Sequence, residues 1–198
     1  MISRNGRQSD LAINPLFIER WSPRAFTGET MTLDELKVLL EAARWAPSAS
    51  NIQPWRFLYA LKGDKTFDTF LDLLMPGNQV WAGSASVLLF VCSDTLSRRS
   101  DGTSRPSRSH SFDAGAAWAM LALQAQLSGY AAHGMGGVDF DRAAKVLNVP
   151  SEFRIEAAVA IGRMADKSIL PEDLQAREVP SQRKPLSEIM FEGGFDAG

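Results

Sequence analysis

The stretch at residues 85–93 constrains the fold more than any other, because it is almost continuously apolar. Strands with one face in water alternate apolar and polar residues, whereas strands buried on both faces do not. The run therefore predicts a strand covered on both faces. Cys92, the single cysteine of the chain, lies inside it. We expect no internal disulfide, a poorly nucleophilic thiol and a cytoplasmic location.

Helical and extended patterns are interleaved around this strand. Thr32 and Glu35 match a capping box and precede leucines at helical spacing, which predicts a helix over residues 33–46. Further helices are expected at 14–19, 64–75, 112–128 and 139–147, and strands at 55–61, 130–135 and 155–161. No repeat or linker divides them, so residues 1–198 are predicted to form one mixed α and β domain.

Two segments lack this periodicity. Residues 97–109 contain four arginines and five serines and are predicted to form an exposed, mobile loop. Residues 165–198 form a C-terminal arm that is rich in proline and charge but also carries apolar side chains. Ordering each residue of such an arm costs about 1–2 kcal/mol. The arm is therefore expected to pack on something, either a partner subunit or its own domain.

The composition argues against several classes of function. A net charge of -2 provides no general attraction to nucleic acid or to an anionic membrane. No stretch approaches the roughly 20 apolar residues of a membrane-spanning helix. Two histidines and one cysteine provide no credible zinc site. His110, Asp113 and a serine at 48 or 50 could be imagined as a hydrolase triad, but no G-x-S-x-G sequence is present, so a hydrolase is not expected.

The segment at residues 44–55 is the strongest indication of a ligand. Pro47 and Pro54 restrict the backbone at either side of a short polar run. The polar side chains between them are Ser48, Ser50, Asn51 and Gln53. So many short donors and acceptors on a rigid loop suit a flat polar ligand, such as a nucleotide cofactor.

Three weaker patterns accompany this loop. Arg20, Ser22 and Arg24 can converge on a phosphate, although an exposed basic turn explains them equally well. Arg183 and Lys184 matter only if the arm folds back to the same anion. The glycines at 134, 136 and 137 let backbone N–H groups approach a ligand closely, although a tight turn is the simpler interpretation.

Taken in order along the chain, these motifs resemble the FMN-dependent nitroreductase family, and the nearest likeness is to its small bacterial members. The likeness extends from about residue 14 to residue 190. The segments that carry it are Arg20-x-Ser22-x-Arg24, residues 46–55, residues 111–117, residues 132–137 and residues 183–186. Several motifs in the right order are more specific than any one of them.

The resemblance implies an α+β fold with a central, mostly antiparallel sheet flanked by helices. It also implies an intertwined homodimer with two FMN sites at the subunit interface, in which the C-terminal extension at 165–198 wraps the partner subunit. Arg20 and Ser22 would bind the FMN phosphate, joined by Arg183 or Lys184. Arg24 would lie near N1 and O2 of the flavin.

The same resemblance assigns the remaining cofactor contacts. Trp21 takes the second position of the arginine motif. Gly136 and Gly137 would offer backbone N–H groups near N5 and O4, and Asn78 would be a polar contact of the ring. The ring or ribityl chain would be reached from the partner subunit by the loop of Pro47, Ser48, Ala49, Ser50, Asn51 and Gln53.

The function implied by the resemblance is ping-pong hydride transfer from NADH or NADPH through FMN to nitroaromatic, quinone or similar electron-poor acceptors. FMN N5 would carry the chemistry, so no catalytic side chain and no metal are expected. Two alternatives stay open. One is an FMN-binding protein without turnover, acting as a flavin store or sensor. The other is a specialised relative that reduces one metabolite or consumes flavin.

Overall fold

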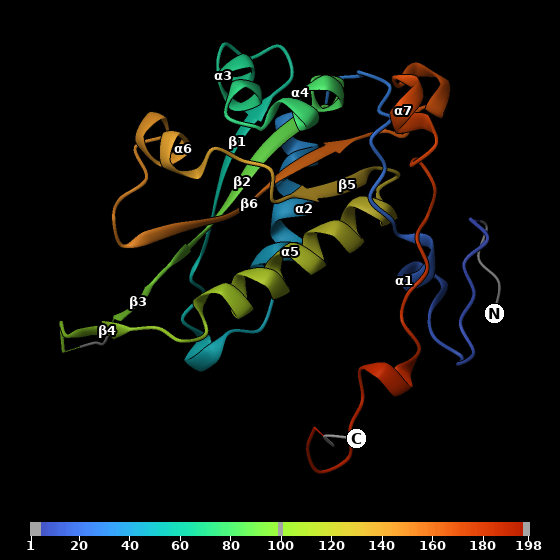
Figure 1. The fold of residues 1–198 in the computed structure, drawn as a ribbon. Helices are drawn as coiled ribbons and strands as arrows, with labels where there is room; N and C mark the ends of the chain where they lie inside the picture. The colour runs from blue at the N-terminus through green and yellow to red at the C-terminus, as the bar shows by residue number, and fades with distance from the viewer. Residues whose placement is uncertain (1–4, 99–100, 196–198) are drawn as a thin grey trace.

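The computed structural model describes residues 5–98 and 101–195. The described residues do not include 1–4, 99–100 and 196–198. The prediction of a single domain over 1–198, of a loop over 97–109 and of an arm over 165–198 therefore lies partly outside the described residues. Four antiparallel strands form one sheet in the order β1-β2-β6-β5 (Figure 1). Their bounds are β1 Trp55–Leu61, β2 Val87–Asp94, β5 Ala131–Met135 and β6 Phe153–Gly162. The predicted central antiparallel sheet is confirmed.

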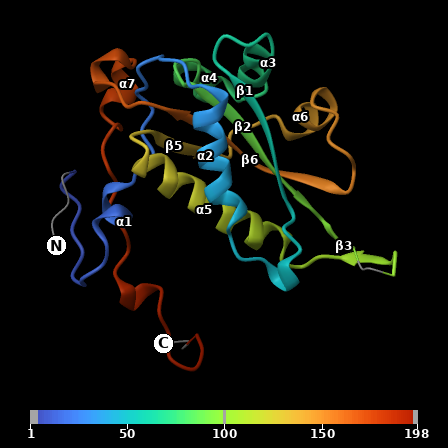
Figure 2. The same cartoon turned by 180° about the vertical axis from the view of Figure 1, so that it is seen from behind.

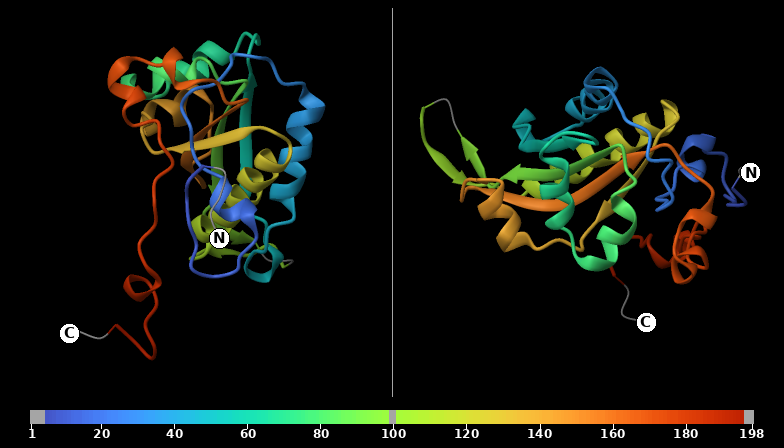
Figure 3. Two further views of the ribbon diagram at one scale, coloured as in Figure 1. Left: turned by 90° about the vertical axis from the view of Figure 1, so that its right-hand side faces the viewer. Right: turned by 90° about the horizontal axis from the view of Figure 1, so that it is seen from above.

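Helices cover both faces of this sheet, and the central strand β2 is therefore buried at every position. On one face, Val87, Leu89 and Val91 pack against α2 (Leu33–Arg44) and α5 (His110–Leu127). On the other face, Leu88, Phe90 and Cys92 pack in a second core. The helices of that core are α3 Phe67–Asp72, α4 Pro76–Ala82, α6 Phe140–Val146 and α7 Glu172–Gln175. The two layers are visible on either side of the sheet in Figure 3.

The predicted capping box begins α2 as expected. Thr32 Oγ1 accepts from the Glu35 N–H, and Glu35 accepts from the Thr32 N–H at 2.8 Å. Glu35 also accepts from the Tyr130 hydroxyl at 2.8 Å, which ties α2 to the start of β5. These bonds, those from Thr32 foremost, lower the pKa of Glu35 to about 2. A second predicted cap is also present, since Asn14 accepts from the Leu16 N–H at the start of α1 (Pro15–Glu19).

Two predicted elements were wrong. The helix expected over 64–75 ends at Asp72, because Leu74 pairs with Val138 in an isolated bridge, and Pro76 then begins α4. The loop expected at 97–109 contains a hairpin of β3 (Leu96–Arg98) and β4 (Ser104–Pro106). Gly102, at a φ of 84°, supplies the left-handed conformation its turn requires.

The C-terminal arm has two parts that behave differently. Leu170 and Leu174 are buried in the core of their own chain, next to the short helical turn η2 (Lys167–Ile169). From residue 181 to residue 195 every side chain is exposed, including those of the turn η3 (Leu186–Glu188). The end of this second part, from η3 to residue 195, extends away from the body in Figures 1 and 2 and in the left view of Figure 3. Its contact with a partner subunit stays a prediction. Within the described residues, no helix combines the length and apolarity needed to cross a membrane.

Candidate functional site

Three residues that were predicted to bind an anion meet in one cavity. Arg20 and Ser22 lie in the extended segment after α1, and Arg20 Nη1 donates to Ser22 Oγ at 3.4 Å. The tail brings Arg183 to the same place, and the three side chains line a cavity of about 480 Å³. The wall contributed by α5 consists of Trp118, Ala119, Ala122 and Leu123. The cavity thus has a cationic side and an apolar side.

Among the residues that line the first cavity, none is a carboxylate that could balance its cationic side. Burial lowers the pKa of Arg20, and the neighbouring Arg183 lowers it further. In the described part of the chain neither arginine forms an ion pair. Guanidinium groups that form no ion pair with a carboxylate are well suited to bind phosphate oxygens. Lys184, the alternative tail ligand, lines neither of these two cavities, and its exposed ammonium pairs with Glu188 at 3.2 Å.

Arg24, in contrast, is held by a buried carboxylate. Glu178, which is 7% exposed, accepts from the backbone N–H groups of Arg24 at 2.5 Å and Ala25 at 2.9 Å. Its second oxygen lies 3.4 Å from Arg24 Nη1. Glu178 therefore holds both the backbone and the guanidinium of Arg24 in one orientation. Sequence analysis missed Glu178, and nothing near it in the sequence indicates this role.

A second cavity of about 240 Å³ adjoins the first and shares Ser22 and Arg183 with it. Its other lining residues are Arg7, Trp21, Arg24, His133, Arg177, Val179 and Ser181. His133 Nδ1 lies 2.9 Å from the Pro23 carbonyl oxygen, which can only accept, so Nδ1 carries the hydrogen. The pKa of His133 is lowered, and burial is the main cause. The predicted residue Trp21 thus faces this second cavity and not the first.

The predicted glycines and Asn78 lie together beyond the end of β5. Asn78 on α4 donates through Nδ2 to the Gly137 carbonyl at 3.1 Å, and Met75 N–H donates to the same oxygen at 2.9 Å. A Cβ atom at Gly137 would lie 2.5 Å from Asn78 Nδ2, so a side chain there would displace the Asn78 amide. A Cβ at Gly136 would meet no atom within 4 Å. The backbone at Gly136 is therefore open to a neighbouring group.

The backbone of the loop at residues 47–53 is strained at three positions. Ser50, Asn51 and Gln53 all have φ values between 52° and 55°, a conformation that costs non-glycine residues energy. Ser48 Oγ accepts from the Gln53 N–H at 3.0 Å, which closes the loop around the turn η1 (Ala49–Asn51). This hydrogen bond holds the strained backbone in place. The side chains of residues 50 and 51 are exposed.

Within one chain, however, this loop lies away from the arginines. Asp113 in the first turn of α5 accepts from the Ala49 N–H at 3.2 Å, which anchors the loop there. The arginine cavity is lined by Trp118 and Ala122 farther along the helix. At 1.5 Å per residue, Asp113 and Ala122 are roughly 13 Å apart along the axis. Figure 1 shows the loop and α1 near opposite ends of α5. The structure thus does not bring Pro47, Ser48, Ala49, Ser50, Asn51 and Gln53 into the same cavity as Arg20.

A group of serine, histidine and glutamate lies near the N-terminus of α5. Ser93 Oγ is 2.8 Å from His110 Nδ1 and donates to Glu156 Oε1 at 2.5 Å. Glu156 Oε1 itself lies 3.4 Å from the same histidine nitrogen. The ring therefore does not bridge hydroxyl and carboxylate, as a hydrolase triad requires. Ser93 is also fully buried, so a substrate does not reach it.

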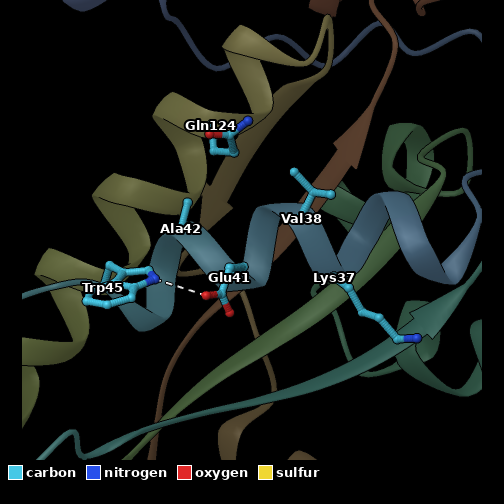
Figure 4. A pocket seen from close by; sticks show the side chains of 6 residues that line it. All are labelled: Lys37, Val38, Glu41, Ala42, Trp45 and Gln124. Atoms are coloured by element: carbon cyan, nitrogen blue, oxygen red, sulfur yellow. Dashed lines mark hydrogen bonds between the residues drawn. The ribbon is translucent and has the colours of Figure 1, made fainter.

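A hollow of about 500 Å³ on the outer side of α2 is also not a candidate site (Figure 4). Its lining residues are Lys37, Val38, Glu41, Ala42, Trp45 and Gln124. Lys37 pairs with Asp34 at 2.9 Å, and Glu41 accepts from Trp45 Nε1 at 2.9 Å. Because these charges already have partners, no convergent polar groups are left to orient a ligand. Within the described residues, no three His, Cys, Asp or Glu side chains are grouped to hold a metal ion.

Comparison with known proteins identifies relatives along nearly the whole chain. The model of the family described as "Nitroreductase family" matches residues 18–75 and 64–163. A crystal structure described as an oxidoreductase containing FMN is 56% identical, with a TM-score of 0.95 and 98% of each chain covered. The CLA biosynthesis enone reductase of Lactiplantibacillus plantarum is 25% identical over 83% of this chain and 89% of its own length. The iodotyrosine deiodinase of Thermotoga neapolitana is 28% identical over 87% and 92%.

Proposed function

Because the chain belongs to the nitroreductase family, we propose that it is an FMN-dependent oxidoreductase that oxidises NADH or NADPH in a ping-pong reaction. The acceptors are nitroaromatics, quinones or similar electron-poor molecules. One observation carries the proposal: Arg20 and Arg183 converge at Ser22, and in the described part of the chain no carboxylate pairs with either arginine. The description of the 56% identical structure as containing FMN supports the choice of cofactor.

The donor set fits a flavin mononucleotide. A phosphate monoester carries a charge of about −1.5 to −2, which two guanidinium groups and a hydroxyl can match. We assign the phosphate to Arg20, Ser22 and Arg183, and leave Lys184 out because it lines neither cavity. When bound, FMN supplies the redox chemistry, since it accepts a hydride at N5 and gathers negative charge at N1 and O2.

The other predicted contacts are assigned to parts of the flavin ring according to where their residues lie. Arg24, held by Glu178, keeps a cation at a constant place beside the second cavity, which suits the pyrimidine end of the ring. The open backbone at Gly136 and the Asn78–Gly137 pair suit the N5 and O4 edge. No side chain needs to act as an acid or base, so the protein binds, orients and excludes water. Trp118, which sequence analysis missed, lies against Gly134 and provides an apolar wall.

The position of the polar loop supports a homodimer. Within one chain the loop at 47–53 and the arginine cavity contact different parts of α5. We propose that two copies pair so that the loop of one copy completes the flavin site of the other. The exposed second part of the arm, with Leu186, Ile189 and Met190 all at least 49% exposed, covers the partner.

Removal of residues 185–198 tests this role of the arm. Because every described residue in this stretch is exposed, the shortened chain should keep its fold and Arg183 while its dimer dissociates more readily. Sedimentation equilibrium measures the dissociation constant, and circular dichroism checks the fold. Glu188→Ala in the full-length chain, which removes only a surface ion pair, serves as the control. An unchanged dimer after truncation would contradict the proposal.

Anaerobic titration tests the function itself. Protein loaded with FMN should lose its visible flavin absorbance when NADH or NADPH is added and regain it when a quinone or nitroaromatic follows. Bound FMN that neither nicotinamide bleaches would favour the flavin store or sensor. The likeness to a deiodinase and an enone reductase keeps a specialised reductase as the second enzymatic alternative. If only one narrow class of acceptor restores the flavin absorbance after bleaching, the result would favour the specialised reductase.

A further inference from the structure

Arg7 in the N-terminal segment is buried to an unusual degree for an arginine. It is 6% exposed, and no other arginine in the described residues is as deeply buried. Its Nη1 donates to the Arg20 carbonyl oxygen at 2.7 Å. Asn5 fastens the same segment to the end of α1 by donating to the Glu19 carbonyl oxygen at 2.9 Å. The segment is thus held directly beside the phosphate residues.

The two cavities connect Arg7 and Arg20 through shared residues. Arg20 lines the first cavity and Arg7 the second, whereas Ser22 and Arg183 line both. A group bound at Ser22 and Arg183 therefore borders the cavity of Arg20 and the cavity of Arg7. Burial lowers the pKa of Arg7, and the charges of Arg183 and Arg20 lower it further. Arg7 is therefore within electrostatic range of both predicted phosphate ligands.

We propose that Arg7 is a third guanidinium of the phosphate site, so that the FMN phosphate lies between Arg20 and Arg7. The proposal rests on the proposed function and deepens it. A phosphate held by three guanidinium groups is attracted to all three, and the phosphate is the only dianion in FMN. The site therefore selects FMN over riboflavin, the same ring without the phosphate. Binding of the phosphate also holds the N-terminal segment against α1.

The test compares FMN with riboflavin, which differ only in the phosphate. Arg7→Gln should weaken FMN binding roughly tenfold, equivalent to about 1.4 kcal/mol, and leave riboflavin binding unchanged. Flavin fluorescence quenching measures both dissociation constants. Asn5→Ala is the matched control, because it loosens the segment without removing a charge. It should change FMN binding much less than Arg7→Gln does.

Each other outcome is decisive. Equal weakening of both flavins by Arg7→Gln would show that Arg7 only clamps the segment, and no weakening would place it away from the phosphate. Either result overturns the proposal. Wild-type protein that does not prefer FMN to riboflavin would instead refute the phosphate site of the proposed function. If Arg7→Gln does not fold, Arg7→Met, which keeps a long side chain but removes the charge, is measured in its place, and the same FMN and riboflavin outcomes decide the proposal.

Discussion

Arg20→Ala is expected to weaken FMN binding by roughly 100-fold, equivalent to about 3 kcal/mol. Arg20 is partly buried, lies beside Ser22 and shares its cavity with Arg183. Each charge-assisted hydrogen bond to a phosphate contributes about 1.5–3 kcal/mol. A guanidinium that faces a phosphate with both nitrogens makes two such bonds. Loss of this one side chain should therefore remove much of the affinity that the phosphate provides.

Equilibrium titration with FMN and with riboflavin measures this effect. Arg154→Ala is a suitable control, since its side chain on β6 is 65% exposed and lies outside both arginine cavities. Riboflavin affinity should change little in Arg20→Ala, because the lost partner is the phosphate. An FMN affinity within twofold of the wild type would place the phosphate elsewhere.

Glu178→Ala is expected to lower the free energy of unfolding by about 3 kcal/mol. The substitution removes the acceptor of two backbone N–H groups, those of Arg24 and Ala25, and leaves them without a partner in a buried region. It also removes the counter-ion of Arg24. A buried donor that loses its acceptor destabilises the fold by its full desolvation penalty. This penalty is larger than the net contribution of the hydrogen bond to the free energy of unfolding.

Urea denaturation of the apo protein measures the change without the stabilising effect of bound flavin. Glu188→Ala is the matched control, because Glu188 is exposed and its pair with Lys184 is worth less than about 1 kcal/mol. Glu178→Gln should lose less than Glu178→Ala, since the amide oxygen can still accept one N–H. If Glu178→Ala and Glu188→Ala were equally stable, the role of Glu178 would be refuted.

Most of the fold could be predicted because its signals are local. The apolar run at 85–93 became β2, which is buried at every position, and the Thr32 capping box begins α2. The errors also have local causes. Pro76 can end one helix or begin the next, and only the bridge between Leu74 and Val138 decides that α4 begins there.

The candidate site was predicted in its parts. Arg20, Ser22 and Arg183 line one cavity, and Asn78 lies beside Gly137, whereas the contacts of these residues with FMN stay predictions. Arg7 was missed, because an arginine in a polar N-terminal segment resembles any solvated charge. Its burial arises from tertiary contact with the end of α1.

By itself, the sequence determined most of the segments that become strands and helices, which loop is bounded by prolines and which residues are chemically able to hold a phosphate. These properties depend on periodicity, on proline and on side-chain type, all of which act over a few residues. Only the tertiary structure decided which cations share a cavity and which already have a partner. Within the described residues Arg20 and Arg183 meet without a carboxylate partner, whereas Arg24 is held by Glu178. The energy of a charge depends on its burial and on its neighbours in space, and the fold brings those neighbours from distant parts of the chain.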